Sequence, residues 1–562
     1  MIDTVEPPTP PNFRLILKLL AAGNWAALKR ECLAGIGREP VPVNYARWRA
    51  LHRLTKGRRA RMRDQMRGWK IAPRISIILS RYDQKSIDSL TRQIYPDWQL
   101  IIVGESSEEF TDSRIRCAPT AGGLSTAIAG ADGQYICFLT PGDELAEHAL
   151  FRIAETLVGD PSLDIIYTDE DLISESNEHT TPFFKPDWSP EYFLAWMYTG
   201  RLAVYRREGV LKIGGVREEF DDAIEYDLVL RLMGASARIH HIPDVLYHRR
   251  ANSVGAPTDA ARRALQTHLD STGQLAMVEI NGATGLHRAR FKLLAKPLVS
   301  IVIPTACRPM TVGNRSTWFL LECVSSIRRL SSYKNIEIVV SDNNDMPADL
   351  AVALAPFDVR CVPFAEKFNL TRKTNFVASH ARGEQLILFN DDIEIITPDW
   401  IEAMLEFSQQ PDIGAVGLMM LFPNDTQQHT GVVIQDGNPR HPFYHYPREH
   451  PGYFHSSEVH RNWAAVTGAC TMTRTEVFKA VGGYSERFAL SYNDVDYCLK
   501  ILEIGKRVVY TPYGKVYHHE SVSRPLTRPD HVTAFKQHWS ARFPRDPYYN
   551  PNLGRHFRVR LS

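Results

Sequence analysis

The sequence has no CxxC pair and no strong excess of charge of either sign. Its eight cysteines stand singly along 562 residues, and several lie in apolar stretches, as Cys137 does in YICFL and Cys470 does in TGACTM. Isolated cysteines in apolar surroundings are typical of buried thiols. This usage predicts a reducing compartment rather than a disulfide-bonded scaffold.

Long apolar runs and a leader are also missing. No apolar run approaches the roughly 18 residues that a membrane span needs, and the opening MIDTVEPPTPPNF has no basic region before an apolar core, so we expect no secretory signal and a cytoplasmic protein. Lys and Arg total 66 against 64 Asp and Glu, a balance that argues against a nucleic-acid partner. The 44% hydrophobic content is sufficient for sizeable cores, and the length predicts about three to four domains.

The middle and the end of the chain repeat each other. The matching segments are PRISIILSRY (73–82) with PLVSIVIPTA (297–306), WQLIIVGES (98–106) with IEIVVSDNN (336–344), and GQYICFLTPGDEL (133–145) with GEQLILFNDDIEI (383–395). Each repeat alternates β-rich runs with helical stretches. This pattern predicts an α/β fold with a mostly parallel sheet that is covered on both faces.

Only the second repeat has acidic residues at these strand ends. Asp342 stands where the first repeat has Gly104, and Asn390-Asp391-Asp392 stands where it has Thr140-Pro141-Gly142. Ligands of open parallel sheets bind at the carboxyl ends of strands. There, Asp342 can accept the N–H of a pyrimidine base, and Asp392 can bind Mg²⁺ or Mn²⁺ that bridges a diphosphate. Either position alone would more often be a turn, but together they predict a nucleotide site.

A further acidic residue opens a predicted helix. In SYNDVDYCLKILEIG (491–505) the apolar residues recur at helical spacing, so Asp494 falls in the first turn, where the helix dipole favours a charged carboxylate. Such a residue can serve as a general base, and helix capping by Asn493 or Asp494 is the alternative. The pair His518-His519 offers an imidazole for a metal such as Mn²⁺, and a hydrogen-bonded strand end is its alternative.

Several longer motifs carry a resemblance to a known family. In order they are KPLVSIVIPT, VVSDNN, FNLTRKTNFVASHARGE, LFNDDIEIITPDW, AVTGAC, GGYSERFALSYNDVDYCLK, YHHESVSR and DPYYNPN. From about residue 73 to 552 the chain resembles glycosyltransferase family 2, especially the two-domain, rhamnosyltransferase-like proteins of O-antigen and surface-polysaccharide assembly. The resemblance implies tandem GT-A domains, a nucleotide-diphosphate sugar donor, a divalent metal and inversion of the anomeric centre.

The resemblance also assigns roles to residues by position. It implies that Asp494 is the catalytic base and that Asp392 and His518 bind the metal, with His519 as a rival for that role. The implied nucleotide-sugar-binding residues are Thr305, Asp342, Asn375, Asn390 and Asp391. The implied acceptor-binding residues are Trp463, Thr467, Gly468 and Asp496. Asn390 departs from the family's DxD motif, so we expect it to contact ribose or a metal-bound water.

The repeats define the expected domain organisation. We expect an N-terminal helical region (1–72), a degenerate GT-A-like domain (73–254), a helical connector (255–296), a catalytic GT-A domain (297–525) and a C-terminal tail (526–562) that folds back on the second domain. Because the first repeat lacks the metal-holding carboxylates, we expect it to be an inactive scaffold or a glycan-binding surface. Glu225 is its candidate base if it retains activity.

Residues 54–70 combine basic residues with an apolar stripe of Met62, Met66 and Trp69 at helical spacing. One interpretation is a helix that docks on an anionic membrane surface, which would place the protein peripherally at the inner face of the membrane. The other is a solvated helix whose Met/Trp stripe packs on the next domain.

The expected function is an inverting, metal-dependent glycosyltransferase. It would move a sugar, with dTDP-rhamnose as the candidate donor, to a glycan or lipid-linked glycan acceptor in surface-polysaccharide assembly. The alternatives are a bifunctional transferase with both domains active and a non-catalytic glycan-binding scaffold. A nucleotidyltransferase ranks below them, because the first strand of the second repeat is followed by PTACRPMTVGNR rather than by a Gly-rich basic loop.

Overall fold

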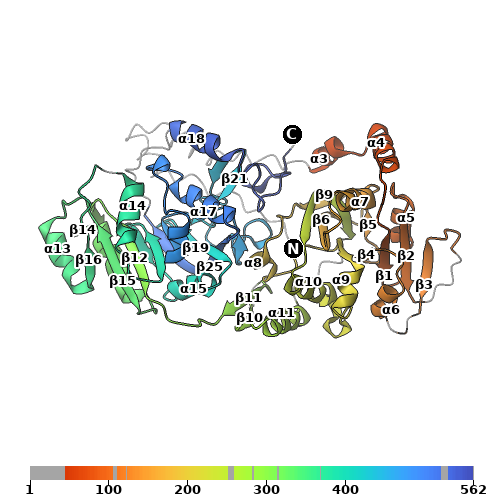
Figure 1. Cartoon of the computed structure of the whole chain (residues 1–562), viewed down its shortest axis with the longest axis horizontal. Coiled ribbons are helices and arrows are strands. Elements are labelled where there is room, and N and C mark those ends of the chain that lie inside the picture. Colours follow the sequence, from red (N-terminus) through yellow and green to blue (C-terminus); the bar gives the residue numbers. More distant parts are fainter. Residues whose placement is uncertain are drawn as a thin grey trace.

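The computed structural model describes residues 45–104, 110–119, 121, 123–250, 258–281, 284–312, 315–367, 369–519 and 529–560. These residues form two α/β lobes that lie side by side, the first coloured red to yellow and the second green to blue (Figure 1). The helical pattern expected between residues 13 and 32 lies outside the described ranges.

The first lobe is built on a nine-stranded sheet with the order β3-β2-β1-β4-β8-β6-β9-β5, in which β7 pairs with β6. Its strands are β1 (Ile75–Leu79), β2 (Trp98–Val103), β3 (Ile115–Ala118), β4 (Tyr135–Leu139), β5 (Glu144–Leu145), β6 (Ile165–Ile173), β7 (His179–Phe183), β8 (Ala203–Arg206) and β9 (Ile239–Arg250). The strand β1 is buried at every position because its ISIIL run packs on both faces of the sheet.

The second lobe has a ten-stranded sheet with the order β16-β15-β12-β17-β24-β19-β25-β18, in which β20 pairs with β19 and β23 with β25. Its strands are β12 (Val299–Pro304), β15 (Ile336–Ser341), β16 (Val359–Cys361), β17 (Gln385–Phe389), β18 (Ile393–Ile395), β19 (Ile413–Leu421), β20 (Gln427–His429), β23 (Arg461–Asn462), β24 (Cys470–Arg474) and β25 (Arg507–His518).

The two sheets place corresponding strands in the same order, as the sequence repeat predicts. In both, the first strand of the repeat pairs in parallel with its two neighbours. The next strand, β8 or β24, runs antiparallel to β4 or β17. The sheets are therefore mixed rather than mostly parallel.

The second lobe's helices cover its sheet with amphipathic faces. They are α12 (Phe319–Leu330), α13 (Ala348–Leu354), α14 (Leu370–Ser379), α15 (Trp400–Ser408), α16 (Thr475–Ala480) and α17 (Asn493–Glu503). Two of these helices begin later than their apolar patterns suggest. The segment STWFLLECVSSIRRL has a helical pattern from Ser316, but α12 begins at Phe319 because Arg315–Trp318 forms the strand β14, which pairs with β13 (Pro309–Val312). In TPDWIEAMLEFSQQ, Thr397 could cap a helix, but its Oγ1 accepts the N–H of Lys515 at 3.1 Å, and α15 begins three residues later.

The first lobe carries α5 (Gln84–Thr91), α6 (Gly123–Ala129), α7 (Ala149–Gly159), α8 (Pro190–Phe193), α9 (Arg207–Lys212) and α10 (Ile224–Gly234), and is preceded by α3 (Tyr45–His52) and α4 (Lys56–Arg67). The apolar stripe of α4 and its C-terminal flank packs on the core of this lobe. Trp69, for example, stacks on Phe151 with ring centroids 5.5 Å apart. The structure therefore agrees with the interpretation in which the Met/Trp stripe packs on the next domain.

Among the helices of the described ranges, none is long and apolar enough to cross a membrane.

The expected helical connector is only partly helical. It contains α11 (Asp259–Ser271), as predicted, followed by an unpredicted hairpin of β10 (Ala276–Ile280) and β11 (His287–Phe291). Arg288 of this hairpin pairs with Glu406 of α15 at 3.0 Å. The hairpin therefore contacts the second lobe, whereas α11 packs against α10 of the first lobe.

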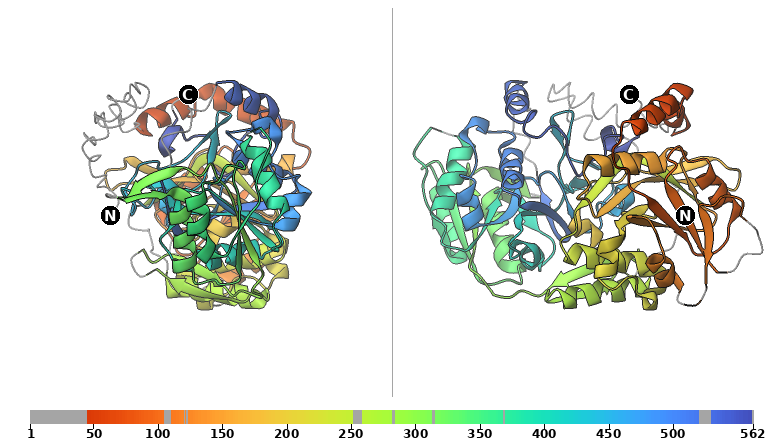
Figure 2. Two further views of the ribbon diagram at one scale, coloured as in Figure 1. Left: turned by 90° about the vertical axis from the view of Figure 1, so that its left-hand side faces the viewer. Right: turned by 45° about the vertical axis from the view of Figure 1, so that its right-hand side comes forward.

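The lobes share hydrophobic clusters, one of which includes Tyr192 and Phe193 of the first lobe and Trp400 and Phe407 of the second. The C-terminal tail joins both lobes. Asp546 accepts the N–H of Ile434 at 2.7 Å, whereas Asn550 donates to Asp169 of the first lobe at 2.9 Å. In Figure 1 and in the right-hand view of Figure 2 the dark-blue C-terminal segment accordingly lies near the junction of the two lobes.

Candidate functional site

His518 and Asp392 meet at one edge of the second sheet. His518 is the last residue of β25, and Asp392 precedes β18, which pairs with that strand. His518 Nε2 lies 3.1 Å from Asp392 Oδ1 and 3.2 Å from Asn390 Nδ2. Strand pairing therefore brings an imidazole and a carboxylate from distant segments together.

Gln428 fixes the tautomer of the His518 ring. Its Nε2 donates to the backbone oxygen of His518 at 3.2 Å, so its Oε1 is the atom 2.6 Å from His518 Nδ1. That oxygen can only accept, so Nδ1 carries the proton that it donates. A histidine held in this way turns Nε2 toward a ligand, as in metal sites where a second residue orients the imidazole.

The donor set at this edge fits a divalent cation. Neutral imidazole and carboxylate oxygen are ligands of Mn²⁺-like metals. The two close, electron-rich atoms of His518 and Asp392 would be stabilised by a cation between them. His519 points elsewhere, because its Nε2 lies 3.6 Å from Glu394. The geometry favours His518 over His519 as the ligand.

The neighbouring Asp391 contacts the loop that follows β12. Thr305 Oγ1 donates to Asp391 Oδ2 at 2.5 Å. The Arg308 guanidinium lies 3.4 Å from Asp391 and 3.6 Å from Asp392. Burial and the neighbouring Asp392 raise the pKa of Asp391. Arg308 was not predicted, because nothing local distinguishes it from other surface arginines.

Asp342 follows β15, as predicted. Its Oδ2 accepts the N–H groups of Asp345 at 2.9 Å and Met346 at 3.0 Å, so this residue does cap the turn. Nearby, the buried Lys373 of α14 donates to Thr305 O and Asn343 Oδ1, each at 2.6 Å. Burial lowers the pKa of Lys373, while Asp342 acts in the opposite direction. Lys373 is a second residue that the sequence did not reveal.

Asp494 lies in the first turn of α17, as predicted, next to two residues expected at the acceptor. Its Oδ2 accepts the N–H of Gly468 at 2.9 Å and the hydroxyl of Thr467 at 3.3 Å. A Cβ at Gly468 would lie 2.4 Å from the Tyr484 hydroxyl and 3.0 Å from Asp494 Cβ. Glycine is needed there for this close approach.

The two clusters lie next to each other. Because β17 pairs with β24, the N–H of Asn390 donates to Ala469 O at 2.9 Å. His429 on β20 accepts the N–H of Thr467 through Nε2 at 3.4 Å, and its neighbour Gln428 holds His518. The candidate metal ligands, Asp392 and His518, and the candidate base, Asp494, therefore lie at the same end of the sheet.

Three predicted site residues make contacts inside the protein. Trp463 is fully buried under the Arg461 guanidinium, which lies 3.6 Å from the ring centroid. Asp496 is 1% exposed and accepts the indole N–H of Trp539 at 3.0 Å; burial raises its pKa. Asn375 exchanges two 2.8 Å hydrogen bonds with the backbone of Tyr484. Trp463 and Asp496 are therefore not at an accessible acceptor surface, and Asn375 positions the loop beside Asp494.

In the first lobe, most acidic side chains of the matching segments already form hydrogen bonds or ion pairs with other side chains. Asp169 accepts from His241 and Asn550, Glu170 pairs with Lys185 and Arg249, and Asp227 pairs with Arg217 and Arg231. Glu225 is the residue best suited to titration, since burial raises its pKa to about 7 against the opposing effect of Arg201. These contacts support a structural role for Asp169, Glu170 and Asp227.

A further group that could hold a metal ion comprises Asp171, His179 and His248. The two histidine Nδ1 atoms lie 2.9 and 2.6 Å from the Asp171 oxygens. The Tyr45 hydroxyl also donates to Asp171, at 2.7 Å. These donors satisfy the carboxylate without a cation and attach α3 to the first sheet.

Comparisons with known proteins identify a family for part of the second lobe. Residues 300–482 match the family model described as "Glycosyl transferase family 2". The chain is 34% identical over 559 residues to "O-antigen biosynthesis protein RfbC" of Myxococcus xanthus, covering 92% of this chain and 43% of that protein. It is 28% identical over 165 residues to "N-acetylglucosaminyl-diphospho-decaprenol L-rhamnosyltransferase" of Mycobacterium tuberculosis, covering 26% and 51%.

The protein y4gI of Sinorhizobium fredii is also 34% identical, over 88% of this chain and 59% of its own length. The chain thus spans about half the length of the curated relatives that it matches. Among solved structures, a mannosyltransferase from Pyrobaculum calidifontis in complex with GDP-Man and Mn²⁺ aligns with a TM-score of 0.30 and 15% identity, covering 41% of this chain and 59% of that one. For GalNAc-T7 with UDP, GalNAc and Mn²⁺ the values are 0.34 and 14%, with 44% and 51% covered. The family match shows that residues 300–482 form a glycosyltransferase family 2 domain with a GT-A-like α/β fold.

Proposed function

We propose that the second lobe is an inverting, metal-dependent glycosyltransferase that uses a nucleoside-diphosphate sugar. The proposal is carried by the shared sheet edge, where Asp392 and His518 lie next to Asp494 with Thr467 and Gly468. A metal-ligand pair beside a positioned carboxylate is what transfer from a diphosphate donor requires.

Asp494 is the proposed general base. The acceptor hydroxyl attacks the anomeric carbon from the face opposite the diphosphate, while Asp494 takes its proton. The bond from that carbon to the diphosphate oxygen breaks, and the oxygen keeps the electron pair. The contacts from Gly468 and Thr467 fix the carboxylate in the first turn of α17.

A divalent cation, Mg²⁺ or Mn²⁺, would be held by Asp392 and His518 and would supply positive charge for the departing diphosphate. Arg308, 3.6 Å from Asp392, is a protein cation at the same edge. Asp342 and Lys373 lie on the neighbouring strand end and helix, where the base and ribose are proposed to bind.

The relatives indicate the substrate class. One is named for O-antigen biosynthesis and another for rhamnosyl transfer to a lipid-linked diphospho-sugar. We therefore propose surface-polysaccharide assembly as the process, dTDP-rhamnose as the donor and a glycan or lipid-linked glycan as the acceptor. Cytoplasmic action at the inner face of the membrane would suit such an acceptor.

The chain is proposed to contain two tandem GT-A domains at 73–254 and 297–525, of which the first is a scaffold. Two observations support this proposal. Corresponding strands have the same order in the two sheets, and most acidic side chains of the matching segments in the first lobe are bound by other side chains. Glu225, with a pKa raised to about 7, motivates the second candidate, in which both domains are active. If turnover survived in Asp494→Asn but disappeared in Glu225→Gln, the active domain would be the first.

The test is a thermal-shift screen of the full chain against nucleotide sugars with Mn²⁺. A cognate donor should raise the melting temperature only when the metal is present, and Asp392→Asn should abolish this shift. His519→Ala is the matched control and should retain it. A shift that is equal with and without Mn²⁺ in the wild type would contradict the metal-dependent site.

A further inference from the structure

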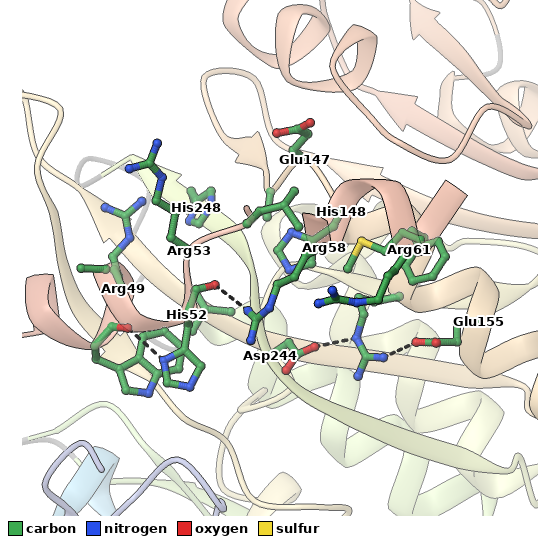
Figure 3. A pocket seen from close by; sticks show the side chains of 18 of the residues that line it. Arg49, His52, Arg53, Arg58, Arg61, Glu147, His148, Glu155, Asp244 and His248 are labelled. Atoms are coloured by element: carbon green, nitrogen blue, oxygen red, sulfur yellow. Dashed lines mark hydrogen bonds and ion pairs between the residues drawn. The ribbon is translucent and has the colours of Figure 1, made fainter. Parts of the chain in front are cut away.

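A cavity of about 920 Å³ lies between helices α3 and α4 and the first lobe, outside the candidate site of the second lobe. Residues from α3, α4, α7 and β9 line this cavity, here called the N-terminal chamber (Figure 3). The family match begins at residue 300, so the transferase domain does not include it. Its volume is within the range of roughly 300–1,000 Å³ that is usual for small-molecule sites.

Four arginines give the chamber a positive charge. Arg49 lies on α3, Arg53 in the following loop, and Arg58 and Arg61 on α4, and all four line the cavity. Arg58 donates to the backbone oxygen of His52 at 3.2 Å. Within the described ranges, no carboxylate lies within ion-pair distance of any of the four guanidinium groups.

The acids of the chamber are already paired with other arginines. Glu147 binds Arg59 at 2.6 Å. Glu155 and Asp244 both bind Arg152, Asp244 at 2.6 Å. Like charges gathered without counter-charges repel one another, and an anionic ligand would offset that repulsion.

The chamber also has an apolar wall. Met62 of α4 packs on the first lobe's core with Phe151, and both line the cavity. Trp48 stacks on His52 with centroids 4.1 Å apart. The wall and the arginines together suit a ligand with an anionic group and an apolar part.

We propose that the N-terminal chamber binds a phosphate-bearing ligand through these four arginines. Guanidinium groups form paired, charge-assisted hydrogen bonds with phosphate oxygens, and several of them together can neutralise a diphosphate. This recognition does not need a metal, unlike the proposed donor site. The phosphate can belong to a soluble compound or to a lipid headgroup, and the apolar wall accommodates either.

The experiment is a calorimetric titration of the full chain with inorganic pyrophosphate in the presence of EDTA, which removes metal-dependent binding in the second lobe. The triple variant Arg49→Gln, Arg53→Gln, Arg61→Gln should bind about tenfold more weakly or worse. The matched control is the triple variant Arg47→Gln, Lys56→Gln, Arg63→Gln. It removes equal charge from exposed positions of the same helices that do not line the cavity, and it should bind like wild type.

Equal weakening in both triple variants, or no pyrophosphate binding by the wild type, would overturn the proposal. Sedimentation with phosphatidylglycerol vesicles then identifies the source of the phosphate. Loss of vesicle binding in the chamber variant alone assigns a lipid headgroup, whereas pyrophosphate binding without chamber-dependent vesicle binding assigns a soluble phosphate compound. Because no turnover is measured, failure here leaves the proposed transferase untouched.

Discussion

At the scale of single residues, the proposed site depends on Asp494, whose carboxylate accepts hydrogen bonds from Gly468 and Thr467. Replacing Asp494 with Asn removes the proton acceptor but preserves the size of the side chain. We expect turnover to fall by about 10²–10⁴-fold, while the affinity for nucleoside diphosphate stays close to that of wild type. Kinetics combined with calorimetry separate these effects, and near-normal turnover would remove the assignment.

Gln428 is expected to act on the metal through His518. Its side-chain oxygen accepts from the ring at 2.6 Å, so Gln428→Ala frees the imidazole to rotate and to change tautomer. We expect Mn²⁺ affinity to fall by about 10–100-fold, measured by calorimetry. His519→Ala serves as the control and should leave the affinity unchanged; equal losses in the two variants would argue against the role of Gln428.

Comparison of the two repeats singled out Asp342 and Asp392, and the helical spacing of residues 491–505 singled out Asp494. Each of the three follows a local pattern of strand end or helix start. Lys373, Arg308 and Gln428 could not be predicted in this way, since their importance comes from contacts made across the fold. The burial of Asp496 has the same origin. Its partner Trp539 belongs to α18 (Pro529–Trp539), more than forty residues along the chain.

At the scale of elements, most strands and helices could be predicted from their apolar patterns. The predictions fail where contacts with a segment distant in the sequence determine the local structure. Residues 315–318 form the strand β14 rather than the start of a helix, because they pair with β13. The hydroxyl of Thr397 accepts the N–H of Lys515 instead of capping α15. The β10–β11 hairpin was missed because its alternation is short and the first of its strands, β10, buries only Val278, while Met277 is 67% exposed. The surface that covers its other face includes Glu406 of α15.

Glu406 gives this hairpin contact a pH dependence. Burial raises the pKa of Glu406 to about 7, against Arg288, which lowers it. The folded protein therefore keeps a proton that the unfolded chain releases near its ordinary pKa of 4.5. The resulting stability is fully present below that value and is lost as the pH rises through 7.

We expect the melting temperature of the wild type to fall from pH 5 to pH 8 more steeply than that of Glu406→Gln, in which position 406 stays uncharged. The difference should correspond to on the order of 1–3 kcal/mol. Scanning calorimetry at both pH values measures it. Parallel slopes would show that Glu406 does not titrate in this range.

At the scale of the whole molecule, the two lobes share a core and a buried ion pair. Arg507 Nη2 lies 2.9 Å from Glu191 Oε1, and Glu191 is 3% exposed. Removing the acid in Glu191→Ala leaves the guanidinium largely without its partner, which should cost about 2–4 kcal/mol. We expect one cooperative transition at a lower temperature in calorimetry.

The control for this change is Glu476→Ala, which removes the exposed partner of Arg474 and should cost less than about 1 kcal/mol. Two separate transitions in wild-type protein would contradict the shared core. The repeat in the sequence predicted two similar sheets, but it could not predict this interface, because Glu191 and Arg507 are 316 residues apart.

The central claim is that a divalent cation binds between Asp392 and His518. It is tested most directly by a crystal structure of the full chain with Mn²⁺ and a nucleoside diphosphate, in which anomalous scattering locates the metal. The account predicts a manganese peak between Asp392 and His518, next to the diphosphate. An absent peak, or a peak only at Asp171, His179 and His248 of the first lobe, would contradict it.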